Sequence, residues 1–186
     1  MRGSKSHTNA LKVVDLSLAQ PTNHNLPVVH GLNEWRGHTR DNIPWVIHRG
    51  DVRKVLATLS DNSFDCVVTS PPYYWQRDYD VNGQIGKEPT IEGYVNVIAD
   101  VMDSVRRVLS NDGLLFLNLG DTYYSAKGQP KGVDRKNGAR RFGLRAVDAS
   151  GLGVARKTAI GIPWRVAIEM ITRGWTLRSP IVWRRK

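Results

Sequence analysis

From residue 45 onward, apolar and polar positions follow a pattern that predicts strands alternating with helices. The apolar run from Trp45 to His48 ends at Gly50-Asp51, as a strand that closes into a turn does. Residues 52–59 follow with their apolar side chains on one side, which predicts a short helix. The first 44 residues of the chain, by contrast, are mostly polar and show no periodicity. We therefore expect a polar N-terminal arm over residues 1–44.

Two further apolar runs and a long amphipathic segment complete the pattern. Residues 64–69 are apolar on both faces except at Asp65, and two prolines then end the strand because proline cannot donate to a sheet. Residues 91–109 carry apolar side chains three and four positions apart, which marks one face of a helix. Residues 114–119 predict a third buried strand that ends in a turn at Gly120-Asp121. Strand, helix and strand in this order predict a parallel α/β sheet.

The C-terminal third begins with a segment that lacks apolar surface. Residues 125–157 hold nine Lys or Arg, two acidic residues and six Gly, so we expect a flexible basic loop. Residues 162–173 predict a helix that Pro163 opens near its first turn, and residues 175–183 predict a further strand despite Pro180. The domain interpretation is an arm over 1–44 and a single α/β region over 45–186.

Composition narrows the class of partner. A chain of 186 residues with 27 Lys and Arg against 17 Asp and Glu has a formal charge of +10, which suits a polyanion such as nucleic acid. A solvated basic surface with no partner is the alternative that charge alone leaves open. The single cysteine, Cys66, excludes a disulfide within the chain and a cysteine-rich zinc site, and no metal site is expected. No apolar stretch is long enough for a membrane span or signal peptide, so we expect a cytoplasmic protein.

The loop Thr69-Ser70-Pro71-Pro72-Tyr73 follows the second apolar strand, where ligands bind in open α/β sheets. Two successive prolines offer carbonyl acceptors without N–H donors, the Ser70 hydroxyl adds a further acceptor, and Tyr73 adds a flat aromatic face. Such an edge suits the exocyclic amine of a base pulled out of its stack, because holding both amine protons leaves the nitrogen lone pair available for attack. A rigid turn that merely ends the strand is the structural alternative.

This loop, together with further strings along the chain, resembles the permuted DNA amino-methyltransferases of restriction-modification systems and phages. The resemblance extends from about residue 46 to residue 183 and includes, in order and spacing, the strings that begin at Arg77, Gly83, Asn118, Gly161, Gly174 and Ile181. It implies a Rossmann-like α/β sheet and an enzyme that transfers methyl from S-adenosylmethionine to cytosine N4 or adenine N6 of double-stranded DNA. The Ser-Pro-Pro-Tyr variant favours cytosine N4, with adenine N6 as the alternative.

The resemblance also implies roles for individual residues. Ser70, Pro71 and Pro72 would bind the target amine, and Tyr73 would stack on the base. Asp51 resembles the acid that meets the cofactor adenine, and without the neighbouring match an ordinary turn would be the preferred interpretation of a lone Gly-Asp. Asn118 and Asp121 are candidates for lining the pocket, and a turn cap is an alternative for Asp121. Five basic residues of the expected loop are candidates for contacting the DNA backbone, namely Lys131, Arg135, Lys136, Arg140 and Arg141.

One expected part of the family pattern is not found. The family places a Phe-x-Gly-x-Gly cofactor loop after the catalytic half, and the glycines at 151, 153 and 161 follow no apolar strand that could present such a loop. We therefore expect an incomplete sheet that corresponds to the catalytic half, either a truncated fragment or one subunit completed by a C-terminal half. Such a half-sheet would expose an apolar edge or face. A non-catalytic DNA-binding fragment is the competing interpretation.

Overall fold

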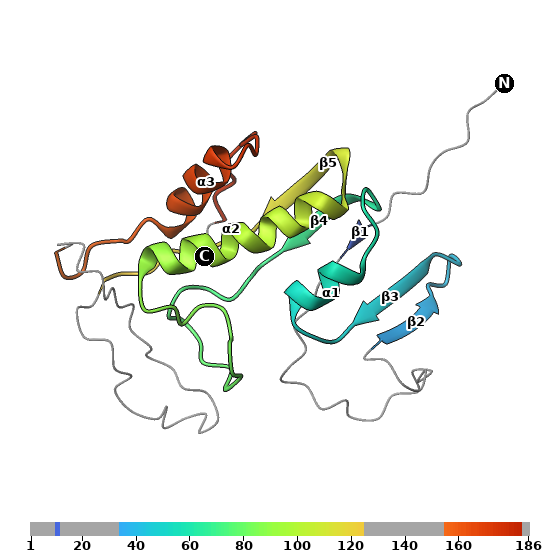
Figure 1. The fold of residues 1–186 in the computed structure, drawn as a ribbon, viewed down its shortest axis with the longest axis horizontal. Coiled ribbons are helices and arrows are strands. Elements are labelled where there is room, and N and C mark those ends of the chain that lie inside the picture. The colour runs from blue at the N-terminus through green and yellow to red at the C-terminus, as the bar shows by residue number, and fades with distance from the viewer. Residues whose placement is uncertain (1–9, 12–33, 125–154, 184–186) are drawn as a thin grey trace. The chain divides into compact units, whose positions relative to one another are not determined.

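The computed structural model describes residues 10–11, 34–124 and 155–183. They belong to two compact units: unit 1 combines Met1–Ser70 with Asp103–Asn118, and unit 2 combines Pro71–Met102 with Leu119–Lys186. The elements in chain order (Figure 1) are β1 (Ala10–Leu11), β2 (Glu34–His38), β3 (Pro44–His48), α1 (Val52–Thr58), β4 (Phe64–Thr69), α2 (Ile91–Val108), β5 (Leu109–Leu117) and α3 (Ile162–Thr172). No helix in these ranges is long and apolar enough to cross a lipid bilayer.

The main sheet of unit 1 has the order β1-β4-β5 and is parallel throughout. This confirms the expected parallel pairing of the strand at 64–69 with the one that follows the long helix. β5 begins directly after α2, however, and a register shift between Phe64 and Cys66 accommodates its extra residues. Residues 110–113, which separate the predicted helix from the predicted strand, thus lie within β5 at its irregular start. From Cys66 and Leu114 onward the register is regular, so both strands end together.

The expected arm is not wholly irregular, and the expected first strand does not join the main sheet. β2 lies within residues 1–44 and pairs antiparallel with β3, with Trp35 opposite Ile47 and Gly37 opposite Trp45. A Cβ at Gly37 would lie 2.4 Å from the Trp45 ring, so glycine lets the indole cross the neighbouring strand. β1 also lies within the expected arm and adds a short parallel strand beside β4.

α1 and the start of β4 are fixed by the end of α2 within unit 1. The Arg107 guanidinium donates to the carbonyl oxygens of Leu56 and Leu59 at 2.6 and 2.9 Å, and it forms an ion pair with Asp61. Both carbonyls lie at the C-terminal end of α1, where Leu56 also accepts from the backbone N–H of the C-cap residue Leu59 at 3.1 Å, so the guanidinium adds a donor where helical donors run out. Ser63 donates its backbone N–H to the Val108 carbonyl oxygen at 2.8 Å. The basic end of α2 thereby aligns the strand that leads into the Ser-Pro-Pro-Tyr loop.

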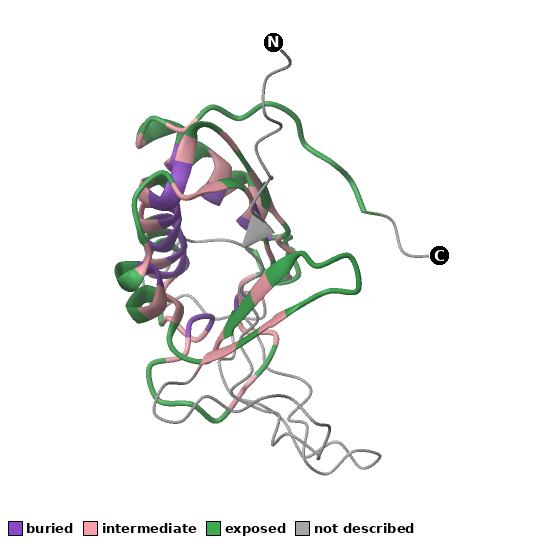
Figure 2. Ribbon diagram, turned by 90° about the vertical axis from the view of Figure 1, so that its right-hand side faces the viewer, coloured by how far each residue is buried: buried purple, intermediate pink, exposed green. Residues whose placement is uncertain are grey.

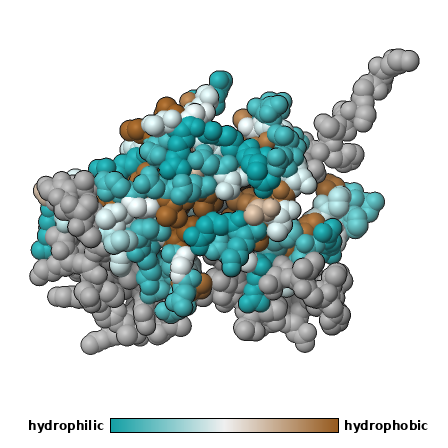
Figure 3. Space-filling model, viewed as in Figure 1, coloured by the Kyte–Doolittle hydropathy of each residue, from teal (hydrophilic) through white to brown (hydrophobic). Residues whose placement is uncertain are grey.

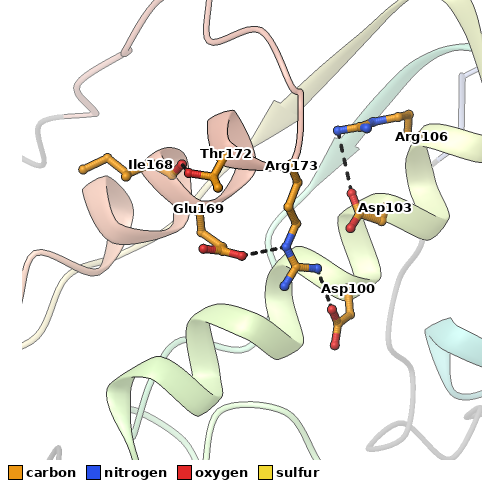
Figure 4. Close-up of polar contacts among 7 residues, drawn as sticks. All are labelled: Asp100, Asp103, Arg106, Ile168, Glu169, Thr172 and Arg173. Atoms are coloured by element: carbon orange, nitrogen blue, oxygen red, sulfur yellow. Dashed lines mark hydrogen bonds and ion pairs between the residues drawn. The ribbon is translucent and has the colours of Figure 1, made fainter.

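α2 matches the helix predicted from spacing, and its buried residues lie along one side (Figure 2). Its fully or nearly fully buried side chains include Ile91, Tyr94, Ile98, Met102, Val105 and Val108. In unit 2, α3 confirms the helix expected over residues 162–173. Arg173, at its C-terminal end, donates to Glu169 at 2.7 Å and to Asp100 of α2 at 2.6 Å, while Asp103 pairs with Arg106 at 3.7 Å (Figure 4).

The expectation that β4 and β5 are buried on both faces is wrong. Val67 is 2% exposed, but Val68 is 54%, Leu114 53% and Phe116 45% exposed. Because side chains alternate along a strand and Val68 lies opposite Phe116, the exposed residues share one face of the sheet. The described part of the main sheet therefore has one face with exposed apolar side chains. Hydrophobic side chains also reach the surface among hydrophilic ones on the side drawn in Figure 3.

The strand expected over residues 175–183 is absent from the described part of the chain. Trp175 to Trp183 are assigned no strand, and Ile181, Val182 and Trp183 are strongly exposed. Pro180 lacks the N–H that a sheet requires, and no described strand offers this segment a partner. The prediction was wrong because apolar composition alone does not make a strand.

Candidate active site

The carboxyl ends of β4 and β5 lie together at one edge of the main sheet. Thr69 is in register with Leu117, and the next residue, Asn118, donates its backbone N–H to the Thr69 carbonyl oxygen at 2.9 Å. Ser70 follows β4 directly, and both Ser70 and Asn118 are exposed. The structure therefore brings two of the sequence-predicted site residues to the edge where open α/β sheets bind ligands.

The loop beyond Ser70 is anchored from beneath by α2. Tyr94 is completely buried, and its hydroxyl donates to the Pro72 carbonyl oxygen at 2.9 Å. Tyr74, also completely buried, places its ring centroid 5.1 Å from that of Tyr94, tilted by 40°. Burial raises the pKa of the Tyr94 phenol above its usual range, with nearby Glu88 and Tyr73 adding to the rise. The phenol is therefore a neutral donor that fixes the second proline.

A left-handed turn follows the two tyrosines. Trp75 has a φ of 51°, its backbone N–H donates to the Gly86 carbonyl oxygen at 2.7 Å, and its indole N–H donates to the Glu88 carbonyl oxygen at 2.8 Å. Gly86 has a φ of 105°, and a Cβ there would lie 3.0 Å from the Tyr73 carbonyl oxygen. Only glycine suits that backbone and that approach. The segment around Gly86 thus holds the loop from the side.

The two strings that follow the loop bind one another. The Gln84 side chain accepts from the Tyr79 backbone N–H at 2.8 Å and donates to the Arg77 carbonyl oxygen at 3.0 Å. Asp78, whose side chain is nearly buried, pairs with Lys87 at 2.6 Å. The strings that begin at Arg77 and Gly83 are therefore held together by their own hydrogen bonds and ion pair, next to the loop that they follow.

Asp121 caps α3 from outside that helix. Gly161 occupies the N-cap position and offers no side-chain acceptor. The Asp121 carboxylate accepts instead from the backbone N–H groups of Gly161 and Ile162 at 3.0 Å, and also from Thr122 at 2.9 Å. A carboxylate at a helix N-terminus satisfies donors that have no partner within the helix. The cap considered as an alternative for Asp121 is therefore present.

The ends of the basic segment are joined next to this cap. Tyr124 donates its backbone N–H to the Thr158 carbonyl oxygen at 2.9 Å, Lys157 donates to the Tyr124 carbonyl oxygen at 2.8 Å, and Tyr123 pairs antiparallel with Ala159. The segment between these ends contains the five predicted DNA-contacting residues, which lie outside the described residues. It leaves and rejoins the described chain beside Asp121.

Comparison with known sequences identifies the family to which this arrangement belongs. The sequence model of the DNA methylase family, N6_N4_Mtase, matches residues 64–186. The chain belongs to the DNA methylases. It is 43% identical over 136 residues to Type II methyltransferase M.SmaI of Serratia marcescens, covering 73% of this chain and 46% of that relative. It is 40% identical over 139 residues to Type II methyltransferase M.Cfr9I of Citrobacter freundii, covering 75% and 46%. The DNA methylase chain thus spans less than half the length of these relatives, and no solved structure matches it.

N6/N4 DNA methyltransferases depend on S-adenosylmethionine. In this DNA methylase chain, Asp51 is the residue predicted from the sequence to contact that cofactor. Asp51 begins α1, and its carboxylate accepts from the Arg53 backbone N–H at 2.9 Å and from the Arg53 guanidinium at 2.9 and 2.5 Å. The pKa of Asp51 is lowered from its ordinary value, and the main cause is the hydrogen bond from the Arg53 side chain. Asp51 follows β3, which is not a strand of the main sheet. Asp51 thus caps α1, as the turn considered as its alternative would, and its contact with the cofactor adenine stays a prediction.

Sequence reasoning misses several residues of the candidate site in this DNA methylase chain. Spacing assigns Tyr94 only to the apolar face of a helix, although a tyrosine among aliphatic residues there indicates a buried hydroxyl with a partner. Gly86 belongs to a recognised string, but its contact with the loop could not be anticipated from spacing. Gln76, whose side chain donates to the Asp121 carbonyl oxygen at 3.0 Å, carries no signal in the sequence.

Proposed function

We propose that this chain supplies the base-binding half of a DNA amino-methyltransferase that transfers methyl from S-adenosylmethionine to N4 of a flipped cytosine. The observation that carries the proposal is the loop at the end of β4, where Ser70 begins an exposed edge and Pro72 is anchored from below. Membership of the DNA methylase family supports it. When bound, the cofactor supplies the electrophilic methyl group.

The division of labour within the loop follows from its contacts. The Pro72 carbonyl oxygen accepts from Tyr94, so we assign Pro72 chiefly to fixing the loop. The Ser70 hydroxyl and the Pro71 carbonyl are then the acceptors that receive the two protons of the target amine. Holding both protons turns the amine lone pair out of conjugation with the ring, which makes the nitrogen a better nucleophile. Tyr73 stacks on the extruded base, a contact worth about 1–3 kcal/mol.

The balance of charge supports DNA as the substrate. The formal charge of +10 favours a polyanion, and the segment richest in Lys and Arg leaves the chain beside Asp121, within the unit that carries Tyr73. We propose that this segment holds the phosphate backbone while the base is extruded. A segment equivalent to the part of the relatives that this chain does not cover would complete the cofactor side of the enzyme and cover the apolar face of β4 and β5.

Mass spectrometry of nucleosides tests the product. The chain is assayed alone and together with the second half of the Serratia marcescens relative, on unmodified DNA with S-adenosylmethionine. We expect N4-methylcytosine, because the neutral Ser70 stands where a carboxylate would favour adenine. Methyladenine as the sole product would replace the N4 assignment by adenine N6. DNA binding without methylation in both preparations would favour the non-catalytic fragment.

A further inference from the structure

Gly120 leaves room that the ring of Tyr73 fills. A Cβ at position 120 would lie 2.7 Å from both Cδ2 and Cε2 of that ring and 3.5 Å from Cζ. Gly120 is not among the described glycines with a positive φ, so its backbone would accept an alanine. The close approach of the tyrosine ring, rather than backbone conformation, is what requires glycine at this position.

A circuit of hydrogen bonds fixes both sides of this contact. The Gln76 backbone N–H donates to the Tyr73 carbonyl oxygen at 3.3 Å, and the Gln76 side chain donates to the Asp121 carbonyl oxygen at 3.0 Å. Asp121 directly follows Gly120 and is itself bound through its carboxylate to the first residues of α3. The tyrosine backbone and the glycine on which its ring rests are therefore held at a set separation. All these residues belong to unit 2.

We propose that Gly120 is a positioning residue, which sets the orientation of the Tyr73 ring before the base arrives, and that Asp121 holds Gly120 in place. The inference rests on the proposed function, because the ring is assigned there to stacking on the target base. A stacking platform that is already oriented loses less freedom on binding, so the contact would favour the extruded base. Asp121 then acts through Gly120 and touches neither base nor cofactor.

The geometry can be tested in the full chain without any activity. Protons that lie against an aromatic ring have resonances shifted by its ring current. Replacing Tyr73→Leu should move the Gly120 Hα resonances toward ordinary glycine values. Gly83 serves as the matched control, because nothing lies within 4 Å of its Cβ position, and its resonances should stay unchanged. Gly120 resonances that are ordinary in the parent and unmoved by Tyr73→Leu would overturn the inference, whatever the enzyme does.

The functional part is tested by a double-mutant cycle in the methyltransferase formed by this chain and the second half. In Gly120→Ala the ring must retreat by about 0.7 Å, from 2.7 Å to an ordinary contact of 3.4 Å. A displacement of this size should lower kcat/KM by about tenfold to a hundredfold. In a Tyr73→Ala background the same change should have little further effect.

Two results of this cycle would overturn the positioning role. One is an equal loss in both backgrounds, because Gly120 would then act independently of the tyrosine. The other is full activity of Gly120→Ala, confirmed as folded by its melting curve. If no variant or parent methylates DNA, the proposed function fails, whereas the resonance shift still decides whether Gly120 orients the ring.

Discussion

The hydroxyl of Tyr94 offers a sharp test of how the loop is held. In Tyr94→Phe the ring remains in its buried place beside Tyr74, and only the donor to the Pro72 carbonyl oxygen is lost. A neutral hydrogen bond contributes about 0.5–1.5 kcal/mol net, and leaving the half-buried carbonyl without this donor raises the total cost to about 1–2 kcal/mol. For a chain of this size, each kcal/mol lowers Tm by about 2–4 °C.

Thermal unfolding followed by circular dichroism measures this cost. Tyr123→Phe is the matched control, because Tyr123 is 68% exposed and its hydroxyl can bond to water instead. We expect a fall in Tm of about 2–8 °C for Tyr94→Phe and no change for the control. Equal melting temperatures of Tyr94→Phe and the parent would refute the anchoring role of the phenol.

The pH dependence of stability gives a second test of the buried Tyr94 phenol. The pKa of Tyr94 is raised in the folded chain above its ordinary value of 10.0, so the unfolded chain loses this proton first as pH rises. Fewer protons on the unfolded state mean that stability falls with rising pH. The contribution is complete below pH 10.0 and is lost as pH rises toward the folded pKa. Tyr94→Phe should therefore flatten the alkaline loss of stability, and an unchanged alkaline limb would contradict burial of the phenol.

Three further predictions concern other parts of the chain. Asp121→Ala should lower the free energy of unfolding by about 1–2 kcal/mol, because α3 loses its cap, whereas Asp103→Ala at an exposed pair should cost much less; equal costs in urea unfolding would contradict the cap. The lowered pKa of Asp51 means that its stabilising contribution is present above pH 3.8 and is lost as pH falls below it. Asp51→Asn should therefore reduce the acid dependence of stability, and an unchanged acid limb would argue against the Arg53 contact. The last prediction concerns the neutralisation, in one variant, of five basic residues: Lys131, Arg135, Lys136, Arg140 and Arg141. In salt titrations of DNA binding, the log-log slope of affinity against salt should fall by about 0.9 for each phosphate contact removed. An unchanged slope with unchanged affinity would show that the segment does not contact DNA.

Periodicity predicts well the elements that bury a single face. α2 matches the helix predicted from spacing, and the bounds of β4 and α3 match the segments predicted over 64–69 and 162–173. These patterns succeed because burial against a core repeats at the period of the element itself. The Ser-Pro-Pro-Tyr loop could likewise be placed at the end of β4, because two prolines stop a strand wherever they occur.

Pairing between distant segments could not be predicted in the same way. The partner of β3 is β2, which lies in a polar stretch with no strong strand pattern, so the sequence pattern places β3 in the wrong sheet. The segment before Trp183 is as apolar as a strand, yet nothing in its own sequence reveals whether a neighbour is available to pair with it. Contacts such as Tyr94 with Pro72 and Asp121 with Gly161 join residues 22 and 40 positions apart, which no local spacing specifies.

Methyl transfer by loop variants tests the central claim most directly. The chain joined to the second half of the Serratia marcescens relative is incubated with DNA and methyl-labelled S-adenosylmethionine, and label in the DNA is measured beside a melting curve. We predict that the parent labels cytosine at N4, while Tyr73→Ala and Pro72→Ala each lose most of the incorporation but still melt cooperatively. Full incorporation by either folded variant would contradict the assignment of this loop as the site of catalysis.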